Sequence, residues 1–288
     1  MIAIAESGST KCDWVLLNGT GKIEKEFKTQ GFNPYFHSTE FVVKTLSECA
    51  DLEGVREEVN TLYFYGAGCS NEQLKGTIRE GLGQVFSRAA IHVDHDLLAA
   101  AYSLYEGEPV ISCIIGTGSN SCFFDGKKVE ERVPALGFIL GDEASGSYFG
   151  KQVLADYFYH RLPSEMYRDF KERFDLNWGD TLKKVYGNVH ANVYLASFMR
   201  FVMDHRENAY VTEMVKEGMA RFIDIHVTNY PDYHKYQVGF VGSIAHLFED
   251  ILREELEKRD CRAGKIIKHP VAELVNYHLT YKNILSIA

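Results

Sequence analysis

Two short glycine-rich turns, each set between apolar strands, are the segments of this sequence best suited to bind an anion. The first turn is Ser7-Gly-Ser-Thr-Lys11 and the second is Gly116-Thr-Gly-Ser119. Small residues let a ligand approach backbone N–H groups closely, and the hydroxyls add further donors. Each turn leads into a strand, so neither is a Walker loop or a dinucleotide fingerprint. Together they predict two-sided binding of a nucleotide's phosphates, although a plain hairpin loop explains the first turn alone about as well.

Residues in and beside the first turn suit a phosphate chain with a metal ion. Glu6 ends the first strand and could lie in a magnesium shell. Three neighbouring side chains could face the β- and γ-phosphates: Ser9, Thr10 and Lys11.

An aspartate at the junction of a strand and a helix is a candidate general base. Residues 91–95 form an apolar-polar strand, and Asp96 begins a helix of small residues. A carboxylate there could accept a proton from a substrate hydroxyl. The residues alone favour a simpler role, in which Asp96 caps the helix. A metal site made by His92, Asp94 and His95 is a further alternative, but the run has no established ligand spacing.

Residues 136–146 join an apolar stretch to Gly-Asp-Glu and the start of another helix. Asp142 and Glu143 could order this loop through Asx-type bonds, or they could hydrogen-bond the hydroxyls of a sugar. Gly31-Phe-Asn-Pro34 is likewise either a turn or a polar contact on a loop.

The elements that must position these residues recur in the two halves of the chain. Each half begins with a glycine-rich hairpin, continues into a third strand, and later contains a buried strand that ends in glycine before a helix. The third strands are expected at 22–28 and 127–133, the later strands at 62–68 and 238–243, and the helices from about 71 and at 245–259. Internal duplication explains this repetition. Residues 147–229 are mostly helical in pattern, and a tail helix at 270–288 could pack on the first half.

The bulk composition indicates a cytoplasmic globular protein of two domains. The chain has 288 residues, of which 45% are hydrophobic and 25% charged. We expect an N-terminal domain of residues 1–108, which the helix at 270–288 could complete, and a larger domain of residues 109–269. The net charge of −9 disfavours nonspecific nucleic-acid binding. No membrane-spanning run or signal peptide is evident, and the six cysteines contain no CxxC pair.

The order of these motifs resembles that of the BadF/BadG/BcrA/BcrD ATPase-like family, and within it the N-acetylglucosamine kinases. The shared order is Gly-Ser-Thr-Lys, the aspartate before a small-residue helix, Gly-Thr-Gly-Ser-Asn, Gly-Asp-Glu-x-Ser and Val-Gly-Ser. The resemblance covers essentially the whole chain. It implies an α/β fold, a duplicated ribonuclease-H-like (actin-like ATPase) fold with two lobes around a central cleft. It also implies an ATP-dependent kinase that phosphorylates the primary hydroxyl of an N-acetylated amino sugar, with Mg²⁺, and homodimers are common among related enzymes.

The resemblance also assigns residues by position. The catalytic aspartate falls best on Asp96, with Asp94 as second choice, and the metal position falls on Glu6. The nucleotide-binding positions are Ser9, Thr10, Lys11, Gly116, Thr117, Gly118, Ser119, Gly242, Ser243 and Ala245. The sugar-binding positions are Asn33, Asn120, Gly137 and Asp142.

The sequence departs from the family pattern at two positions, of which the first bears on the acceptor and the second on the entry into the following helix. Leu136 stands where animal enzymes have a tryptophan against the sugar, so N-acetylglucosamine, N-acetylmuramic acid derivatives and glucosamine all stay open. Ala144 replaces the usual glycine after Gly-Asp-Glu.

Two other functions remain as alternatives. One is an ATPase activator of 2-hydroxyacyl-CoA dehydratases, although the Glu-x-Cys-Ala-Ala-Gly-Thr-Gly segment of those activators does not occur here. The other is a non-catalytic sugar or nucleotide sensor.

Overall fold

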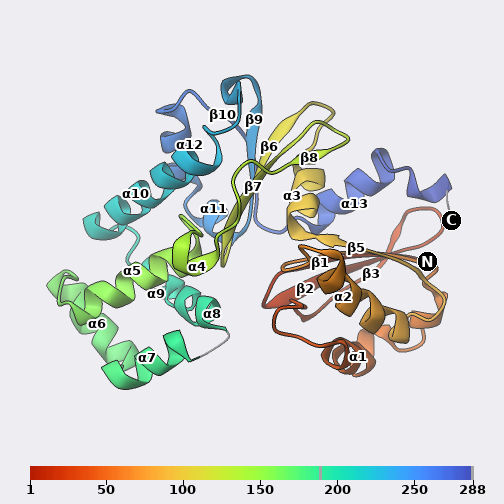
Figure 1. Cartoon of the computed structure of the whole chain (residues 1–288), viewed down its shortest axis with the longest axis horizontal. Coiled ribbons are helices and arrows are strands. Elements are labelled where there is room, and N and C mark those ends of the chain that lie inside the picture. Colours follow the sequence, from red (N-terminus) through yellow and green to blue (C-terminus); the bar gives the residue numbers. More distant parts are fainter. Residues whose placement is uncertain (188–189, 287–288) are drawn as a thin grey trace. The chain divides into compact units, whose positions relative to one another are not determined.

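The protein divides into two compact α/β units, shown in Figure 1 as a computed structural model that describes residues 1–187 and 190–286. Unit 1 comprises Met1–Tyr105 and a segment that begins at His269, and unit 2 comprises Glu106–Lys268. Across the described residues, every helix is too short or too polar to cross a membrane.

Unit 1 is built on a five-stranded sheet in the order β3-β2-β1-β4-β5. β1 pairs antiparallel with β2 and parallel with β4, so Ser7 lies opposite both Cys12 and Gly66. The strands are β1 (Ile2–Ser7), β2 (Lys11–Leu17), β3 (Ile23–Gln30), β4 (Thr61–Gly66) and β5 (Ala90–His95). Because the parallel strands end at one edge of this sheet, the first glycine-rich turn, the Gly66–Gly68 loop and Asp96 share that edge.

Helices cover both faces of this sheet, as Figure 1 shows. Alternate residues of β1 enter different cores, because successive side chains of a strand point to opposite faces. Ala3 and Ala5 belong to a core with Trp14 and helices α1 and α2 (α1, Thr39–Ser47; α2, Glu72–Val85). Ile2 and Ile4 are buried on the opposite face, which α3 (Asp96–Leu104) and α13 (Val271–Thr280) cover.

Unit 2 repeats the same sheet. Its order is β10-β9-β6-β7-β8, in which β6 pairs antiparallel with β7 and parallel with β9. Each strand therefore has a counterpart in unit 1, and the predicted duplication is confirmed. The strands are β6 (Val110–Ile115), β7 (Ser119–Phe124), β8 (Val129–Glu130), β9 (Gln237–Val241) and β10 (Arg262–Ile267).

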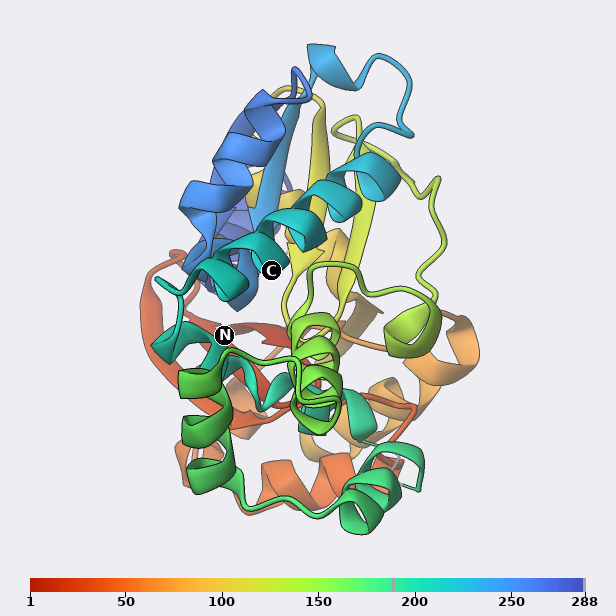
Figure 2. The same ribbon diagram turned by 90° about the vertical axis from the view of Figure 1, so that its left-hand side faces the viewer.

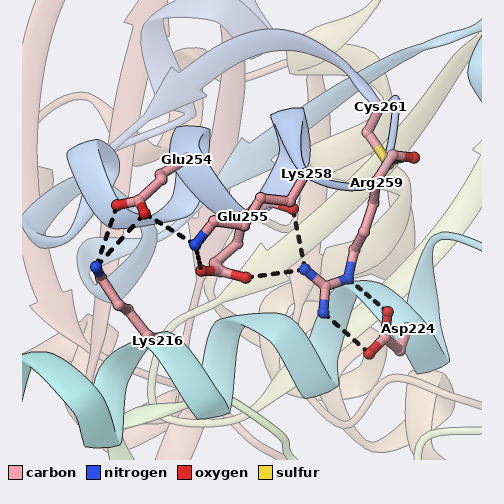
Figure 3. A network of polar contacts seen from close by, with 7 residues as sticks. All are labelled: Lys216, Asp224, Glu254, Glu255, Lys258, Arg259 and Cys261. Carbon is pink, nitrogen blue, oxygen red and sulfur yellow. Dashed lines mark hydrogen bonds and ion pairs between the residues drawn. The ribbon is translucent and has the colours of Figure 1, made fainter.

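The helices of unit 2 lie mostly between β8 and β9, as the predicted helical stretch requires. They are α4 (Gly137–Leu140), α5 (Gly146–Phe158), α6 (Ser164–Phe174), α7 (Trp178–Tyr186), α8 (Ala191–Ala196), α9 (Met199–Asp204) and α10 (Ala209–His226), followed by α11 (Ser243–Leu247) and α12 (Glu249–Glu257). Figure 2 shows α10 and α12 across one face of the sheet. Between them the Arg259 guanidinium binds the Asp224 carboxylate and, at 2.8 Å, that of Glu255 (Figure 3). Lys216 lies 3.4 Å from Glu254 in the same network.

Three predicted elements differ from the structure. The tail helix expected over 270–288 is α13, which ends at Thr280 and is followed by a 3₁₀ turn at Ile284–Ser286. The helix expected over 245–259 is two helices, α11 and α12, which meet at Phe248. The break buries the Phe248 ring in the core of unit 2, where it is 1% exposed. The third strand of unit 2, expected over 127–133, is only the two-residue β8. Residues 188–189 of the predicted helical stretch and residues 287–288 of the predicted tail lie outside the described residues.

Candidate functional site

The first glycine-rich turn is closed by its own backbone and covered by a second glycine. Gly8 N–H donates to the Lys11 carbonyl at 3.0 Å. Gly31 lies so close to this turn that a Cβ there would stand 2.1 Å from the Gly8 oxygen. By contrast, a Cβ on Gly8 would meet only an ordinary contact at 3.8 Å. The fold therefore requires glycine at position 31 but not at position 8, where a bare backbone suits a ligand that approaches closely.

The Asn33 amide is fixed beside this turn because it both donates and accepts a hydrogen bond. Its Nδ2 donates to Ser9 Oγ at 3.2 Å, and its Oδ1 accepts the Tyr35 N–H at 3.1 Å. The backbone of Gly68, with φ of 81°, leaves room for the Asn33 amide, because a Cβ there would lie 2.3 Å from Oδ1. The structure thus brings together a predicted sugar contact and a predicted phosphate contact within unit 1.

Lys11 is oriented by one neighbour on its own strand and one from a distant segment. Its Nζ lies 2.8 Å from Asp13 Oδ2 and 3.1 Å from His269 Nδ1. Asp13 also binds Lys28 at 3.3 Å. Burial alone would raise the pKa of the Asp13 carboxyl, but the hydrogen bonds and positive charges of Lys11 and Lys28 hold it below its ordinary value. A charged ammonium group is therefore held at the first turn.

Glu6 lies beneath the turn in an acidic surrounding. Burial raises its pKa from 4.5 to about 8, and the nearby carboxylates of Asp96 and Asp13 add to the shift, while Lys11 opposes it. A cation bound beside Glu6 would lower its pKa, because the positive charge stabilises the carboxylate. Within the described residues, no group of three or more His, Cys, Asp or Glu side chains could hold a metal alone. The carboxylates of Glu6 and Asp96 nevertheless fit Mg²⁺, because this ion is commonly held by one or two carboxylates together with phosphate and water oxygens.

The two candidate base residues have different surroundings. Asp94 is the penultimate residue of β5, and its Oδ1 lies 2.9 Å from Lys75 Nζ in an ion pair. Asp96 is the first residue of α3, and it lies near Glu6. The expected capping role of Asp96 is wrong, because the N-cap is His95, whose Nδ1 accepts the Leu98 N–H at 3.2 Å. Asp96 is therefore placed beside the first turn by a helix start that His95 caps.

The second glycine-rich turn is also closed by its own backbone, but its closing bond spans one residue fewer. Gly116 N–H donates to the Gly118 carbonyl at 2.9 Å. The first turn of α5 binds it from outside, since Gly146 N–H and Ser147 N–H donate to the carbonyls of Gly116 and Thr117. A Cβ on Gly116 would meet no atom within 4 Å, so the fold does not require glycine there.

A later glycine covers this turn as Gly31 covers the first. Gly242 has a φ of 128°, and a Cβ there would lie 2.3 Å from the Ile115 oxygen. The two residues assigned with it differ in exposure: Ser243 is exposed, whereas Ala245 is fully buried in the core of unit 2. Ala245 therefore has no exposed surface in this structure.

Asp142 brings a carboxylate against the second turn. Its Oδ1 accepts the Ser119 N–H at 3.1 Å, and both carboxylate oxygens would lie 3.0 Å from a Cβ on Gly118. Burial raises the pKa of Asp142, as does the neighbouring Glu143, whereas the Ser119 N–H and Lys151 lower it. One N–H of the predicted phosphate loop is therefore already bound.

The remaining predicted residues of unit 2 are less closely connected. Ser119 Oγ is buried and has no hydrogen-bond partner among the residues that the structure describes, so a ligand could satisfy it. The Asn120 amide oxygen accepts the N–H of its own neighbour, Ser121. Gly137 begins α4 with φ of 69°, and Leu136 before it is 56% exposed.

Comparison with solved structures identifies the fold family. The chain is 31% identical to the "putative N-acetylglucosamine kinase" of Porphyromonas gingivalis, with 99% of this chain and 100% of that chain covered and a TM-score of 0.91. The chain belongs to the sugar kinases of the actin-like superfamily. Neither a protein-family model nor a curated protein matches the sequence.

Two further sugar-kinase structures share the fold at lower identity. The "putative N-acetylglucosamine kinase" of Chromobacterium violaceum is 15% identical, covers 96% of this chain and 98% of its own, and has a TM-score of 0.73. The ROK-family glucokinase of Streptomyces griseus, in complex with glucose and AMPPNP, is 15% identical, covers 96% and 97%, and has a TM-score of 0.58. The predicted two-lobed, actin-like fold is confirmed.

Two residues that contact the candidate site were not found from the sequence. Asp13 orients Lys11, and its signal is its position two residues after Lys11 on the same face of β2. His269 also contacts Lys11, but its distance along the chain leaves no local signal.

Proposed function

We propose that the chain is an ATP-dependent kinase that transfers the γ-phosphate to the primary hydroxyl of an N-acetylated amino sugar, N-acetylglucosamine or a relative. The observation that carries this proposal is the full-length similarity to the kinase of Porphyromonas gingivalis. The candidate residues support it, because both turns present bare glycine backbone to a ligand. We also place the chain in the BadF/BadG/BcrA/BcrD ATPase-like family, on the order of its motifs.

In unit 1 we assign the binding of the terminal phosphates to the first turn. Ser9 and Thr10 would donate hydroxyl hydrogen bonds, and Lys11 would place its ammonium group on the phosphate oxygens. Asn33, which is fixed on Ser9, would bind a hydroxyl of the sugar.

In unit 2 we assign further phosphate contacts to Gly116, Thr117, Gly118 and Ser119. The unpartnered Ser119 Oγ supports this assignment. Gly242, Ser243 and Ala245 would contact the adenosine. Asn120, Gly137 and Asp142 would bind the sugar.

Asp96 is the proposed general base. The oxygen of the sugar hydroxyl forms a bond to the γ-phosphorus while the bond from that phosphorus to the β–γ bridging oxygen breaks, and ADP leaves. The hydroxyl proton passes to the Asp96 carboxylate. Such a base contributes about 10²–10⁴-fold to a rate, whereas positioning and charge neutralisation supply most of the remainder.

Glu6 would hold Mg²⁺ through water or directly. The ion, when bound with ATP, neutralises charge on the phosphate oxygens. The residue's own contribution is a carboxylate whose charge is costly without a cation, as its raised pKa of about 8 indicates.

A panel of sugars tests the proposal. Purified protein with ATP and Mg²⁺ is mixed with N-acetylglucosamine, N-acetylmannosamine, N-acetylmuramic acid, glucosamine and glucose, and ADP release is followed in a coupled assay. We expect at least one N-acetylated amino sugar to stimulate ADP release well above glucose. Absence of sugar-dependent release throughout the panel contradicts the proposal, and preference for glucose contradicts only the amino-sugar assignment.

A further inference from the structure

Unit 2 contains three buried polar side chains in contact that the proposed roles do not use, which we name the Glu143–His226–Ser121 chain. His226 is the last residue of α10, and its Nε2 lies 3.3 Å from Glu143 Oε2. On the other side of the ring, Nδ1 lies 3.4 Å from Ser121 Oγ. The exposed fractions of Glu143, His226 and Ser121 are 7%, 3% and 0%.

The residue types are those of a hydrolytic serine triad, but the surroundings exclude that role. Ser121 lies within β7 and is fully buried, so no substrate carbonyl can reach its oxygen. The ring nitrogens also have the opposite roles, since Nε2 of a protease triad faces the serine. The Glu143–His226–Ser121 chain must therefore have a structural role in the surrounding residues.

The donor and the acceptor in each contact of the Glu143–His226–Ser121 chain follow from the chemistry of the side chains. Burial lowers the pKa of the His226 ring, which is therefore neutral near pH 7, although Glu143 opposes the shift. A carboxylate only accepts, so the proton must lie on Nε2, and Nδ1 must accept from the Ser121 hydroxyl. Arg221 also faces Glu143, at 3.8 Å. A single tautomer thus satisfies both contacts.

Ser121 and Glu143, the outer members of the Glu143–His226–Ser121 chain, each follow a residue assigned to the sugar. Ser121 follows Asn120 in β7, and Glu143 follows Asp142. Asp142 and Ala144 have φ values of 55° and 59°, a conformation that costs free energy for residues other than glycine and persists only under external restraint. The bond from Ser119 N–H to Asp142 is one such restraint, and the contact of Glu143 with His226 is another.

We propose that Glu143 and His226 are positioning residues, which hold the Asp142 loop against β7 so that Asp142 is oriented for the acceptor before the acceptor binds. This inference rests on the proposed sugar-binding role of Asp142. Preorganisation of this kind lowers the ordering cost of binding. Its expected effect is larger on the sugar than on ATP, although Asp142 also binds the N–H of Ser119 in the second turn.

Three variants separate positioning from general stability. Glu143→Leu removes the acceptor of the His226 N–H, Glu143→Gln keeps an oxygen there, and Asp156→Asn is a matched control. Asp156 is also buried in unit 2, at 8%, and accepts a 2.6 Å hydrogen bond from Tyr210. We expect Glu143→Leu to raise the sugar KM about tenfold, with the ATP KM within about twofold, and Glu143→Gln to recover most of that loss. Asp156→Asn should leave the sugar KM unchanged.

Amide exchange of the ligand-free protein gives a second readout that needs no activity. We expect the Ser119 amide, which donates to Asp142, to exchange about tenfold faster in Glu143→Leu but not in Glu143→Gln or Asp156→Asn. If Glu143→Leu does not fold, Ser121→Ala replaces it, with an expected increase of about threefold in both sugar KM and exchange.

Two kinds of failure are distinguishable. Unchanged sugar KM and unchanged Ser119 exchange in a folded Glu143→Leu protein, or in Ser121→Ala where that protein is needed, overturn the positioning role. An equal rise of sugar KM and ATP KM overturns it as well. A wild-type protein without sugar-dependent transfer contradicts the proposed function instead, and Ser119 exchange then decides the positioning role alone.

Discussion

The two glycine-rich turns are each closed by a backbone hydrogen bond, but they carry opposite charges. In each, the N–H of the first glycine closes the turn, and a glycine from another segment covers it. The first turn ends in the Lys11 ammonium group, whereas the second accommodates the Asp142 carboxylate on its Ser119 N–H.

The difference shows which parts of a duplicated unit can diverge. The sheet order is the same in both copies, and beside each turn lies a glycine whose Cβ would overlap a backbone oxygen. These two glycines are not counterparts, since Gly31 follows β3 whereas Gly242 follows β9, the counterpart of β4. The side chains around each turn differ as well. We infer that the first turn serves the phosphates, while the second divides its donors between phosphate and acceptor.

The largest expected effect concerns the acid beside the first turn. Asp96→Asn should lower kcat by about 10²–10⁴-fold, because the amide cannot take the hydroxyl proton. The KM values should change little. Asp94→Asn is the control, since Asp94 is paired with Lys75, and it should lose less than about tenfold. Near-full turnover of Asp96→Asn, with a large loss in Asp94→Asn, would move the base to Asp94.

The pH dependence of stability should report on Glu6. Its pKa is about 8 in the folded protein and near 4.5 when unfolded, so between these values the folded state holds a proton that the unfolded state lacks. The free energy of unfolding of the ligand-free protein should therefore fall as pH rises from 4.5 to 8, by about 4 kcal/mol. Urea denaturation at several pH values measures this. Glu6→Gln should flatten the dependence, and an equally steep decline in that variant would contradict the assignment.

Glycine substitutions should divide into two classes, with one of each class at each turn. Gly31→Ala and Gly242→Ala should destabilise the protein by about 2–4 kcal/mol, because the new methyl group would overlap a backbone oxygen. Gly8→Ala and Gly116→Ala should change stability by less than about 1 kcal/mol. If ligands approach the bare backbone, these two variants should instead raise the ATP KM. Thermal unfolding and steady-state kinetics separate the classes, and a stable Gly242→Ala protein would break the comparison.

The smallest expected effects are the changes in KM that follow from removing the charge of Lys11 or of Asp142. Lys11→Met should raise the ATP KM about tenfold with little change in the sugar KM. Asp142→Asn should raise the sugar KM by a similar factor of about ten and leave the ATP KM within about twofold. Steady-state kinetics with each substrate varied in turn measures both. The same pattern of KM changes in the two variants would show that the turns are not specialised.

The duplication was predictable because the same local sequence patterns occur in both halves of the chain. Alternating apolar strands, glycine turns and helical spacing occur twice in the same order, and the two sheets follow that order. β10 was not found, because Arg262–Ile267 is half-exposed and lacks a buried-strand pattern. The break at Phe248 was missed as well, because burial of one ring against the core overrides the continuous helical spacing around it.

The candidate site was predictable in residue types more than in contacts. Asp96, Lys11 and Asp142 stand out through their motifs. The partners that orient them come from distant segments: His269 reaches Lys11, and His226 reaches the residue after Asp142. Sequence spacing carries no information on such contacts, since tertiary packing alone creates them.

Direct observation of the product tests the central claim, that the chain transfers phosphate from ATP to a sugar. The protein is incubated with ATP, Mg²⁺ and the sugar most active in the panel, and the phosphorus products are followed by ³¹P NMR. The account predicts a phosphate monoester whose phosphorus couples to the protons of the primary carbinol, formed in equal amount with ADP. Release of inorganic phosphate without a sugar phosphate would contradict the account and indicate an ATPase instead.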